Sequence, residues 1–356
     1  MIRRVRIGIL VMVVATVVSG CELYSHEGDD RVVEGVSFTE LFRPPTASEI
    51  QAIESEWAGR STSAVDVQLV AQFRISTSTL SIISHLVDGV THFGGILAPD
   101  GASVGSLPVV VYAHGGDSGV SIDEEVLLVL SFLGDVRNQF VVVVPSFRSE
   151  SIRYQSNIWL SDGPPSPWNY DVDDALSLLS ATSILVPAAD MERVGVVGLS
   201  RGGGVGLLMG IRDPRISVVV DFFGPTDFFG PFIQDVVEEA LLGSRRDLPG
   251  LDFLDEQFIQ AVKRGDMTEE EVRPELIRRS PVLFVDRIPD LQIHHGNLDM
   301  IVPVSQSKSL ETAMLAAGRG PSGFETYYYE LGQHSPITLV GSLDRTVDFL
   351  SRLLEN

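Results

Sequence analysis

From residue 107 to the C-terminus, short apolar runs alternate with longer segments in which apolar residues recur at helical spacing. The apolar runs, which we expect to be strands, cover residues 108–113, 140–144, 194–197, 216–222, 291–294 and 324–331. The segments between them, which we expect to be helices, cover residues 122–133, 170–182, 201–211, 304–317 and 337–354. Strands that are apolar on both faces and alternate with helices are typical of a parallel sheet covered by helices on both sides.

The part of the chain before residue 107 has a different pattern. Residues 65–76 and 80–99 are expected to form antiparallel strands, with a turn signal at Asp88-Gly89. Thr46-Ala47-Ser48-Glu49 has the form of a capping box, and apolar residues follow it at helical spacing. We therefore predict a short N-terminal helix and then an α/β fold with a mostly parallel eight-stranded sheet and helices on both faces.

An extra helical stretch at residues 232–279 interrupts the alternation, and we assign about residues 231–280 to a small helical insertion. The insertion forms either a partial lid at the mouth of a site or an ordinary surface excursion. Several phenylalanines near its start either line an apolar acyl pocket or belong to the core. They are Phe222, Phe223, Phe228, Phe229 and Phe232.

The N-terminus has the layout of an export signal. Arginines at positions 3, 4 and 6 precede a short apolar run from Ile7 to Val18, and small residues follow. Val18-Ser19-Gly20-Cys21 resembles the lipobox of bacterial lipoproteins, in which the cysteine is lipidated, and Cys21 is the one cysteine of the chain. The alternative is an uncleaved anchor with an incidental cysteine.

The formal net charge of −22 restricts the partners that are expected. Such an acidic surface repels the phosphates of nucleic acids, so we expect no nucleic-acid partner. The sequence does not determine the oligomeric state.

A serine surrounded by glycines follows the predicted strand that ends near Val197. Gly198-Leu199-Ser200-Arg201-Gly202 matches G-x-S-x-G between a strand and a helix. In such a sharp turn a side chain at either glycine would collide with its neighbours, and the serine hydroxyl is lifted clear of the sheet. A phosphate-binding loop does not fit, because no Lys-Ser/Thr pair follows the glycines. The remaining alternative is a glycine-rich packing turn.

A serine nucleophile needs a base, and the base needs an acid that orients it. His334 follows the last predicted strand, at the sheet edge where Ser200 is expected to emerge. Asp299 follows the penultimate strand, so the order Ser200, Asp299, His334 is the order expected for an α/β-hydrolase. Asp227 is the second candidate for the acid, and a lone loop aspartate such as Asp299 is more often a helix cap.

The negative charge that develops during acyl transfer needs hydrogen-bond donors. One donor is expected to be the Arg201 backbone N–H, directly after the serine. The other is expected from Gly115 or Gly116, in the loop after the first parallel strand, and the sequence does not decide between them. His114 in the same loop is expected to play a structural role.

A metal site at His294, His295 and Asp299 is possible but is not favoured. Adjacent histidines on a strand point to opposite faces, so they would not converge on one ion. We expect no metal and no organic cofactor.

With these residues, the chain resembles the catalytic α/β-hydrolase domain of the prolyl oligopeptidase family from about Val65 to the C-terminus. The resemblance rests on the stretches VVVYAHGGD, VVVVPSFRS, YDVDDALSLL, GLSRGGG, LQIHHGNLDMIVP and ELGQHSP. It implies the α/β-hydrolase fold, with Ser200, Asp299 and His334 as the triad. The family's peptidases usually carry a large N-terminal β-propeller, whereas only about sixty residues precede the expected strands here. Ser149 also stands where a glycine is expected after Phe-Arg.

The sequence therefore predicts residues 1–20 as a lipoprotein signal peptide, 21–60 as a tether with a short helix, and 61–356 as an α/β-hydrolase catalytic domain. The expected activity is that of a serine hydrolase that forms an acyl-enzyme on a small ester or a short peptide, as in a prolyl oligopeptidase-like serine peptidase. The alternatives are a carboxylesterase or acetyl esterase without peptidase activity, and a catalytically silent ligand-binding lipoprotein. The protein is expected to be exported and lipid-anchored to a bacterial membrane through Cys21, facing the periplasm or the exterior.

Overall fold

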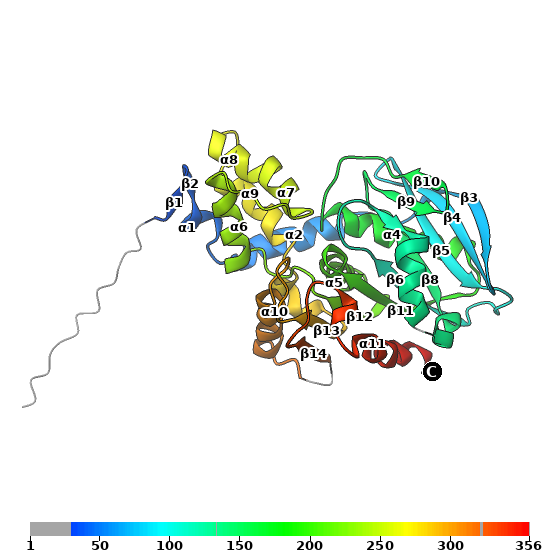
Figure 1. The fold of residues 1–356 in the computed structure, drawn as a ribbon. Helices are drawn as coiled ribbons and strands as arrows, with labels where there is room; N and C mark the ends of the chain where they lie inside the picture. The colour runs from blue at the N-terminus through cyan, green and yellow to red at the C-terminus, as the bar shows by residue number, and fades with distance from the viewer. Residues whose placement is uncertain (1–29, 133, 321–322, 356) are drawn as a thin grey trace, which may run out of the picture.

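The computed structural model describes residues 30–132, 134–320 and 323–355 (Figure 1). The predicted signal peptide and Cys21 lie outside the described residues, so export and lipid anchoring remain predictions. Within the described ranges, no helix is long and apolar enough to cross a membrane.

The centre of the fold is a nine-stranded sheet with the order β14-β13-β12-β11-β6-β8-β5-β4-β3. Neighbouring strands from β14 to β8 run parallel, and β5, β4 and β3 continue the sheet with antiparallel pairings. The strands are β3 (Val65–Ile75), β4 (Ser78–Val87), β5 (Val90–Pro99), β6 (Leu107–Ala113), β8 (Val141–Pro145), β11 (Ala189–Leu199), β12 (Ile216–Phe222), β13 (Asp290–Gly296) and β14 (Phe324–Tyr329).

The α/β-hydrolase fold class is confirmed, and the expected number of eight strands is one too low. A tight hairpin turn divides the apolar segment 78–99 into two strands, β4 and β5, and both join the main sheet. Asp88 and Gly89 form this turn with positive φ angles of 51° and 77°. A two-residue hairpin with this geometry is the kind that Asp-Gly favours.

Helices cover both faces of the sheet because its strands are apolar on both sides. Val109 and Val111 of β6 pack in the cluster that includes α4 and α5, whereas Val110 faces the opposite cluster, which includes α11. The helices are α1 (Phe38–Leu41), α2 (Ala47–Ala58), α3 (Leu127–Phe132), α4 (Tyr170–Leu185), α5 (Arg201–Arg212), α6 (Pro231–Leu241), α7 (Leu251–Leu254), α8 (Gln260–Arg264), α9 (Glu269–Ile277), α10 (Ser305–Ala316) and α11 (Ser342–Leu350).

Two of the expected helices begin later than the sequence suggested. Residues 122–126 form a π-helical turn before α3. The last helix, α11, starts at Ser342 and not at Ile337, because Pro336 opens a short 3-10 turn and Gly341 then adopts a left-handed conformation with φ 79°. Both local features break the regular helical path that the apolar spacing alone indicates.

Short strands extend the fold outside the main sheet. They are β1 (Val32–Val33), β2 (Val36–Ser37), β7 (Val120–Ser121), β9 (Ser151–Tyr154) and β10 (Asn157–Leu160). The hairpin of β1 and β2 lies within residues 21–60, which were expected to form a tether with a short helix. From Asp30 onward the segment is folded, and α1 packs against α9 of the insertion (Figure 1).

Arg273 of α9 fixes the N-terminal segment to the insertion. Its side chain is 1% exposed. The guanidinium donates hydrogen bonds to the carbonyl oxygens of Glu40, Leu41 and Arg43 at 2.8–3.1 Å. It also pairs with both carboxylate oxygens of Glu49, at 2.7 and 3.2 Å. Bidentate pairing of this kind is geometrically specific, so one buried side chain sets the path of residues 40–49.

Replacing Arg273 tests this attachment. We expect Arg273→Met to lower the free energy of unfolding by about 3 kcal/mol, because it removes one partner of a buried ion pair and leaves three carbonyl groups unsatisfied. Urea denaturation measures the change. Arg264→Met is the matched control, since Arg264 forms an exposed pair with Asp266, and it should change stability by less than about 0.5 kcal/mol. Equal effects of the two substitutions would contradict the assignment.

Candidate active site

Ser200 lies at the sharp turn between β11 and α5. Its backbone has φ 55° and ψ −121°, a conformation that residues with side chains rarely adopt. A Cβ atom at Gly198 would lie 2.1 Å from the Gly202 carbonyl oxygen, and one at Gly202 would lie 2.0 Å from the Ala113 carbonyl oxygen. The two glycines are therefore required by contact with backbone, as the sequence predicted.

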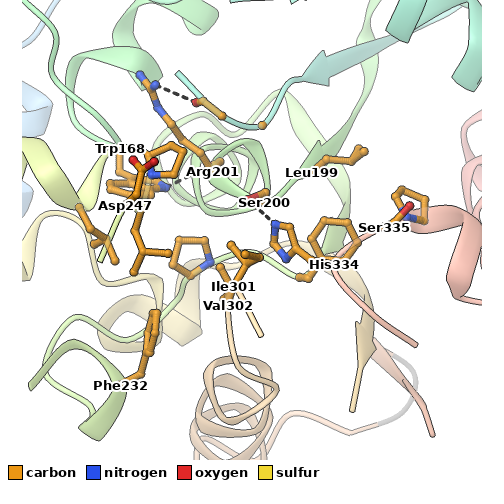
Figure 2. Close-up of a pocket in the computed structure, with 18 of the residues that line it drawn as sticks. Trp168, Leu199, Ser200, Arg201, Phe232, Asp247, Ile301, Val302, His334 and Ser335 are labelled. Atoms are coloured by element: carbon orange, nitrogen blue, oxygen red, sulfur yellow. Dashed lines mark hydrogen bonds between the residues drawn. The ribbon is translucent and has the colours of Figure 1, made fainter. Parts of the chain in front are cut away.

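The structure brings His334 and Asp299 to Ser200 in one hydrogen-bonded row. The Ser200 Oγ is 2.9 Å from His334 Nε2 (Figure 2). On the other side of the imidazole ring, His334 Nδ1 is 2.7 Å from Asp299 Oδ2. The three residues come from the loops after β11, β14 and β13, at the carboxyl edge of the parallel strands. This row has the geometry in which an imidazole can remove a proton from the hydroxyl while the carboxylate orients the ring.

Both carboxylate oxygens of Asp299 accept hydrogen bonds. Oδ1 accepts the backbone N–H groups of Ile301 and Val302 at 2.9 and 3.0 Å. Burial opposes ionisation of the carboxyl group, but hydrogen bonds from His295 and His334 outweigh it and hold the pKa of Asp299 well below its ordinary value. The helix-cap alternative does not apply in its simple form, because α10 begins only at Ser305.

The second candidate for the acid, Asp227, lies elsewhere. Its carboxylate accepts hydrogen bonds from the Ser309 hydroxyl at 2.6 Å and from the Phe229 N–H at 3.0 Å. It therefore stabilises the contact between its own loop and α10, and it is not paired with His334.

The adjacent histidines of β13 have different partners. His294 contacts the Tyr329 hydroxyl and the Gln292 side chain, each at 2.8 Å. His295 contacts the Ser307 hydroxyl at 2.7 Å and the Val302 carbonyl oxygen at 2.8 Å. Within the described ranges, no group of three or more His, Cys, Asp or Glu side chains could hold a metal ion.

The loop after β6 lies against the serine turn. A Cβ atom at Gly115 would be 3.1 Å from the Ser200 Cβ, and Gly116 has a positive φ of 71°. Among the described residues, the backbone N–H groups of Gly116 and Arg201 have no protein acceptor. His114 is fully buried, stacks on Phe147 and contacts the Gly115 carbonyl oxygen through Nδ1 at 3.0 Å. It has the structural role that the sequence suggested.

The side chain of Arg201 turns away from Ser200 into the protein (Figure 2). It pairs with both oxygens of Asp171, at 2.8 and 2.9 Å, and with Glu150 at 2.5 Å. Burial raises the pKa of Glu150 to about 7, although the charge of Arg201 lowers it. This pairing was not predicted from the sequence.

One signal for the Glu150 turn was present in the sequence. Ser149, where a glycine was expected, has a positive φ of 64°. That conformation explains why glycine is the usual residue at this point of the turn that leads to Glu150. A departure from the expected pattern thus marked a strained turn beside the site.

A cavity of about 430 Å³ opens over Ser200 and His334 (Figure 2). The insertion forms one wall, so its interpretation as a partial lid is favoured over a simple surface excursion. Residues of the insertion that line the cavity are Phe232, Asp247, Leu248, Pro249 and Leu251. The wall continues with Trp168, Phe223 and Pro225.

The five phenylalanines considered from the sequence all pack in or against the core, and two of them also line the cavity. Phe223 and Phe232 line the cavity, and the Phe223 ring packs against His334 with centroids 4.4 Å apart. Phe222 and Phe228 are buried in core clusters, and Phe229 packs against the edge of the main cluster. Phe223 and Phe232 also belong to the buried core clusters, so cavity lining and core packing coincide at these two residues.

Several solved structures share this fold at low sequence identity. Acetyl xylan esterase 1 from Thermoanaerobacterium sp. JW/SL YS485 aligns with a TM-score of 0.60 and 19% identity, over 89% of this chain and 98% of that one. An acetyl xylan esterase from Paenibacillus sp. R4 aligns with a TM-score of 0.55 and 16% identity, over 87% of this chain and 98% of that one. An esterase from Pyrococcus furiosus aligns with a TM-score of 0.54 and 15% identity, over 83% of this chain and 99% of that one. A comparison with curated protein sequences finds no match.

A parallel sheet with a serine at its strained strand-to-helix turn defines the α/β-hydrolase fold, and the protein is an enzyme of the serine hydrolase class. The BD-FAE family model matches residues 96–314. The chain therefore belongs to the BD-FAE family, a family of esterase-like α/β-hydrolases.

A single added methyl group tests the glycine requirement of the turn. We expect Gly202→Ala to lower the free energy of unfolding by about 3 kcal/mol, because backbone atoms of β6 cannot move aside without disturbing the sheet. Gly59→Ala is the control, since its Cβ would meet only an ordinary contact at 3.4 Å. Thermal unfolding of both variants measures the difference, and a Gly202→Ala protein as stable as the control would show that the turn tolerates a side chain.

Proposed function

We propose that the protein hydrolyses carboxylic esters through an acyl-enzyme formed on Ser200. The observation that supports this most strongly is the row Ser200–His334–Asp299, with contacts of 2.9 and 2.7 Å. A free serine hydroxyl is a weak nucleophile at neutral pH, and a hydrogen-bonded imidazole is the group that activates it.

In the first half of the reaction, the Ser200 Oγ attacks the ester carbonyl carbon and its proton passes to His334 Nε2. The C–O bond to the alcohol then breaks, and His334 returns the proton to the departing alkoxide oxygen. In the second half, water attacks the acyl carbon, His334 accepts the water proton, and the acid leaves as Ser200 recovers its proton. Asp299 stays ionised throughout and stabilises the imidazolium, a role for which its low pKa suits it.

The developing oxyanion is proposed to be stabilised by backbone N–H groups. The Arg201 N–H at the start of α5 is the first donor, and Gly115 or Gly116 supplies the second. Donors without a protein acceptor next to Ser200 are what this role requires.

An ester is favoured over a peptide as the substrate. The family is esterase-like, and similar structures carry the names of acetyl xylan esterases and an esterase. A prolyl oligopeptidase-like peptidase is the second candidate, and it rests on the stretches GLSRGGG and LQIHHGNLDMIVP. Relative turnover of aryl esters and aminoacyl amides distinguishes the two.

The cavity suggests that one side of the ester is apolar and bulky. Trp168, Phe232, Leu248 and Leu251 face a space of about 430 Å³, which is far more than an acetyl group fills. Burying apolar surface of the substrate there would supply binding free energy of about 25 cal/mol per Å².

Covalent labelling tests the proposed nucleophile. We expect a fluorophosphonate to label the wild-type protein and to leave Ser200→Ala unlabelled, because only the activated hydroxyl attacks phosphorus. Asp299→Asn should fold and should lose about 10⁴-fold in kcat on an aryl ester, since the imidazole loses the partner that orients it. A folded wild-type protein that takes no label and turns over no ester would support the catalytically silent alternative.

The apolar wall generates a prediction about acyl size. We expect Phe232→Ala to reduce kcat/KM about tenfold for an ester with a bulky apolar group and less than about threefold for the matching acetyl ester. Phe253→Ala is the control, because Phe253 lies in the same insertion and does not line the cavity. Equal losses on both esters would show that the wall does not contact the substrate.

A further inference from the structure

Arg201, the residue that follows the nucleophile, has one role for its backbone and another for its side chain. Its backbone N–H is the proposed oxyanion donor, whereas its side chain is 2% exposed and makes only internal contacts. Arg201 Nη1 donates to the Gly116 carbonyl oxygen at 3.0 Å and to Glu150 at 2.5 Å. The side chain therefore reaches from the serine turn to the neighbouring glycine loop.

Glu150 holds the other end of the same loop. Its Oε2 accepts the Gly119 N–H at 3.2 Å, while its Oε1 accepts from Arg201. A Cβ atom at Gly119 would lie 2.1 Å from the Ser151 carbonyl oxygen, so the loop is pressed against the turn that carries Glu150. Residues 116–119 are thus fixed at both ends through one carboxylate and one guanidinium.

Asp171 fixes the guanidinium and the backbone of the serine turn together. It pairs with Arg201 Nε and Nη2 at 2.8 and 2.9 Å and also accepts the Trp168 N–H at 2.9 Å. The Trp168 indole in turn donates to the Arg201 carbonyl oxygen at 3.1 Å. The guanidinium and the main chain of Arg201 are therefore both held by residues at or just before the N-terminus of α4.

We propose that the Arg201 side chain, with Glu150 and Asp171, is a positioning device that sets the spacing between the two oxyanion donors. The donors lie on separate segments, the start of α5 and the loop after β6, and among the residues that the structure describes no backbone hydrogen bond joins these two segments at this point. The two segments are packed together at Gly115 and Gly202, and the guanidinium adds a hydrogen bond between them at the Gly116 carbonyl oxygen. This inference rests on the proposed acyl-transfer function of Ser200.

The number and direction of these hydrogen bonds explain why an arginine occupies position 201. A planar guanidinium has five N–H donors in a fixed fork, so it can satisfy two carboxylates and one carbonyl oxygen at once. A lysine keeps the charge and lacks the fork. Removing one oxyanion donor from a hydrolase costs about 10²–10³-fold in kcat, and a shift of about 1 Å can cost about 10²-fold.

The test compares two buried arginines of the same helix. Arg212 lies at the other end of α5, with its side chain 4% exposed, and pairs with Asp173 of the same helix α4. The variants are Arg201→Lys, Glu150→Gln and, as the matched control, Arg212→Lys. Each is assayed for kcat and KM on an aryl ester, for the rate of inactivation by a fluorophosphonate, and for its thermal midpoint.

We expect Arg201→Lys to lower kcat about 100-fold while KM changes less than about threefold, because the donors act on the transition state and not on the bound ester. The rate of phosphonate inactivation should fall in parallel. Glu150→Gln should lower kcat about tenfold, and Arg212→Lys should stay within about threefold of wild type at a similar loss of thermal stability.

The inference is wrong if Arg201→Lys loses no more kcat than Arg212→Lys, or if its loss appears in KM alone. If Arg201→Lys does not fold, Glu150→Gln decides, and unchanged kcat in that variant overturns the proposal. Failure of the wild-type protein to turn over esters would instead overturn the proposed function. The two failures are therefore distinguishable.

Discussion

The strained turn at Ser200 is the constraint on which the rest of the site depends. A residue with φ 55° is tolerated there because glycines at positions 198 and 202 let β6, β11 and α5 approach to backbone contact. The backbone itself is held by hydrogen bonds from the Ser200 N–H to the Phe222 carbonyl oxygen and from Gly203 to the Ser200 carbonyl oxygen, at 2.9 and 2.8 Å. The hydroxyl therefore emerges at a fixed point, and the loops that carry Asp299 and His334 are arranged around it.

Buried ion pairs organise the interior behind this turn. Helix α4 presents three aspartates that are each at most 1% exposed, Asp171, Asp173 and Asp174, and each is paired with arginine. Pairs of this kind add little net stability, because burying the charges costs nearly as much free energy as their attraction returns. Their fixed geometry matters more here, because the Asp171–Arg201 pair attaches α4 to the serine turn.

Much of the fold could be predicted from the sequence, because the central strands are apolar on both faces and leave little choice of environment. The positions of Ser200, Asp299 and His334 also followed from their place after three of the parallel strands. The pairing of Arg201 with Asp171 could not be predicted, because an acidic residue in the first turn of a helix usually faces solvent, where it interacts favourably with the helix dipole. Glu150 lies in the turn before β9, and no local pattern links it to Arg201. The attachment of residues 40–49 through Arg273 was missed for a related reason, since nothing local in the sequence links positions more than two hundred residues apart.

The central claim is that the three side chains and the backbone donors act on one reacting carbonyl group. A crystal structure of the protein after reaction with a small phosphonate tests it most directly. The account predicts phosphorus bonded to the Ser200 Oγ, with a phosphonyl oxygen within about 3 Å of the Arg201 N–H and of a second N–H from Gly115 or Gly116. An adduct on another residue, or a phosphonyl oxygen turned to solvent away from both donors, would contradict it.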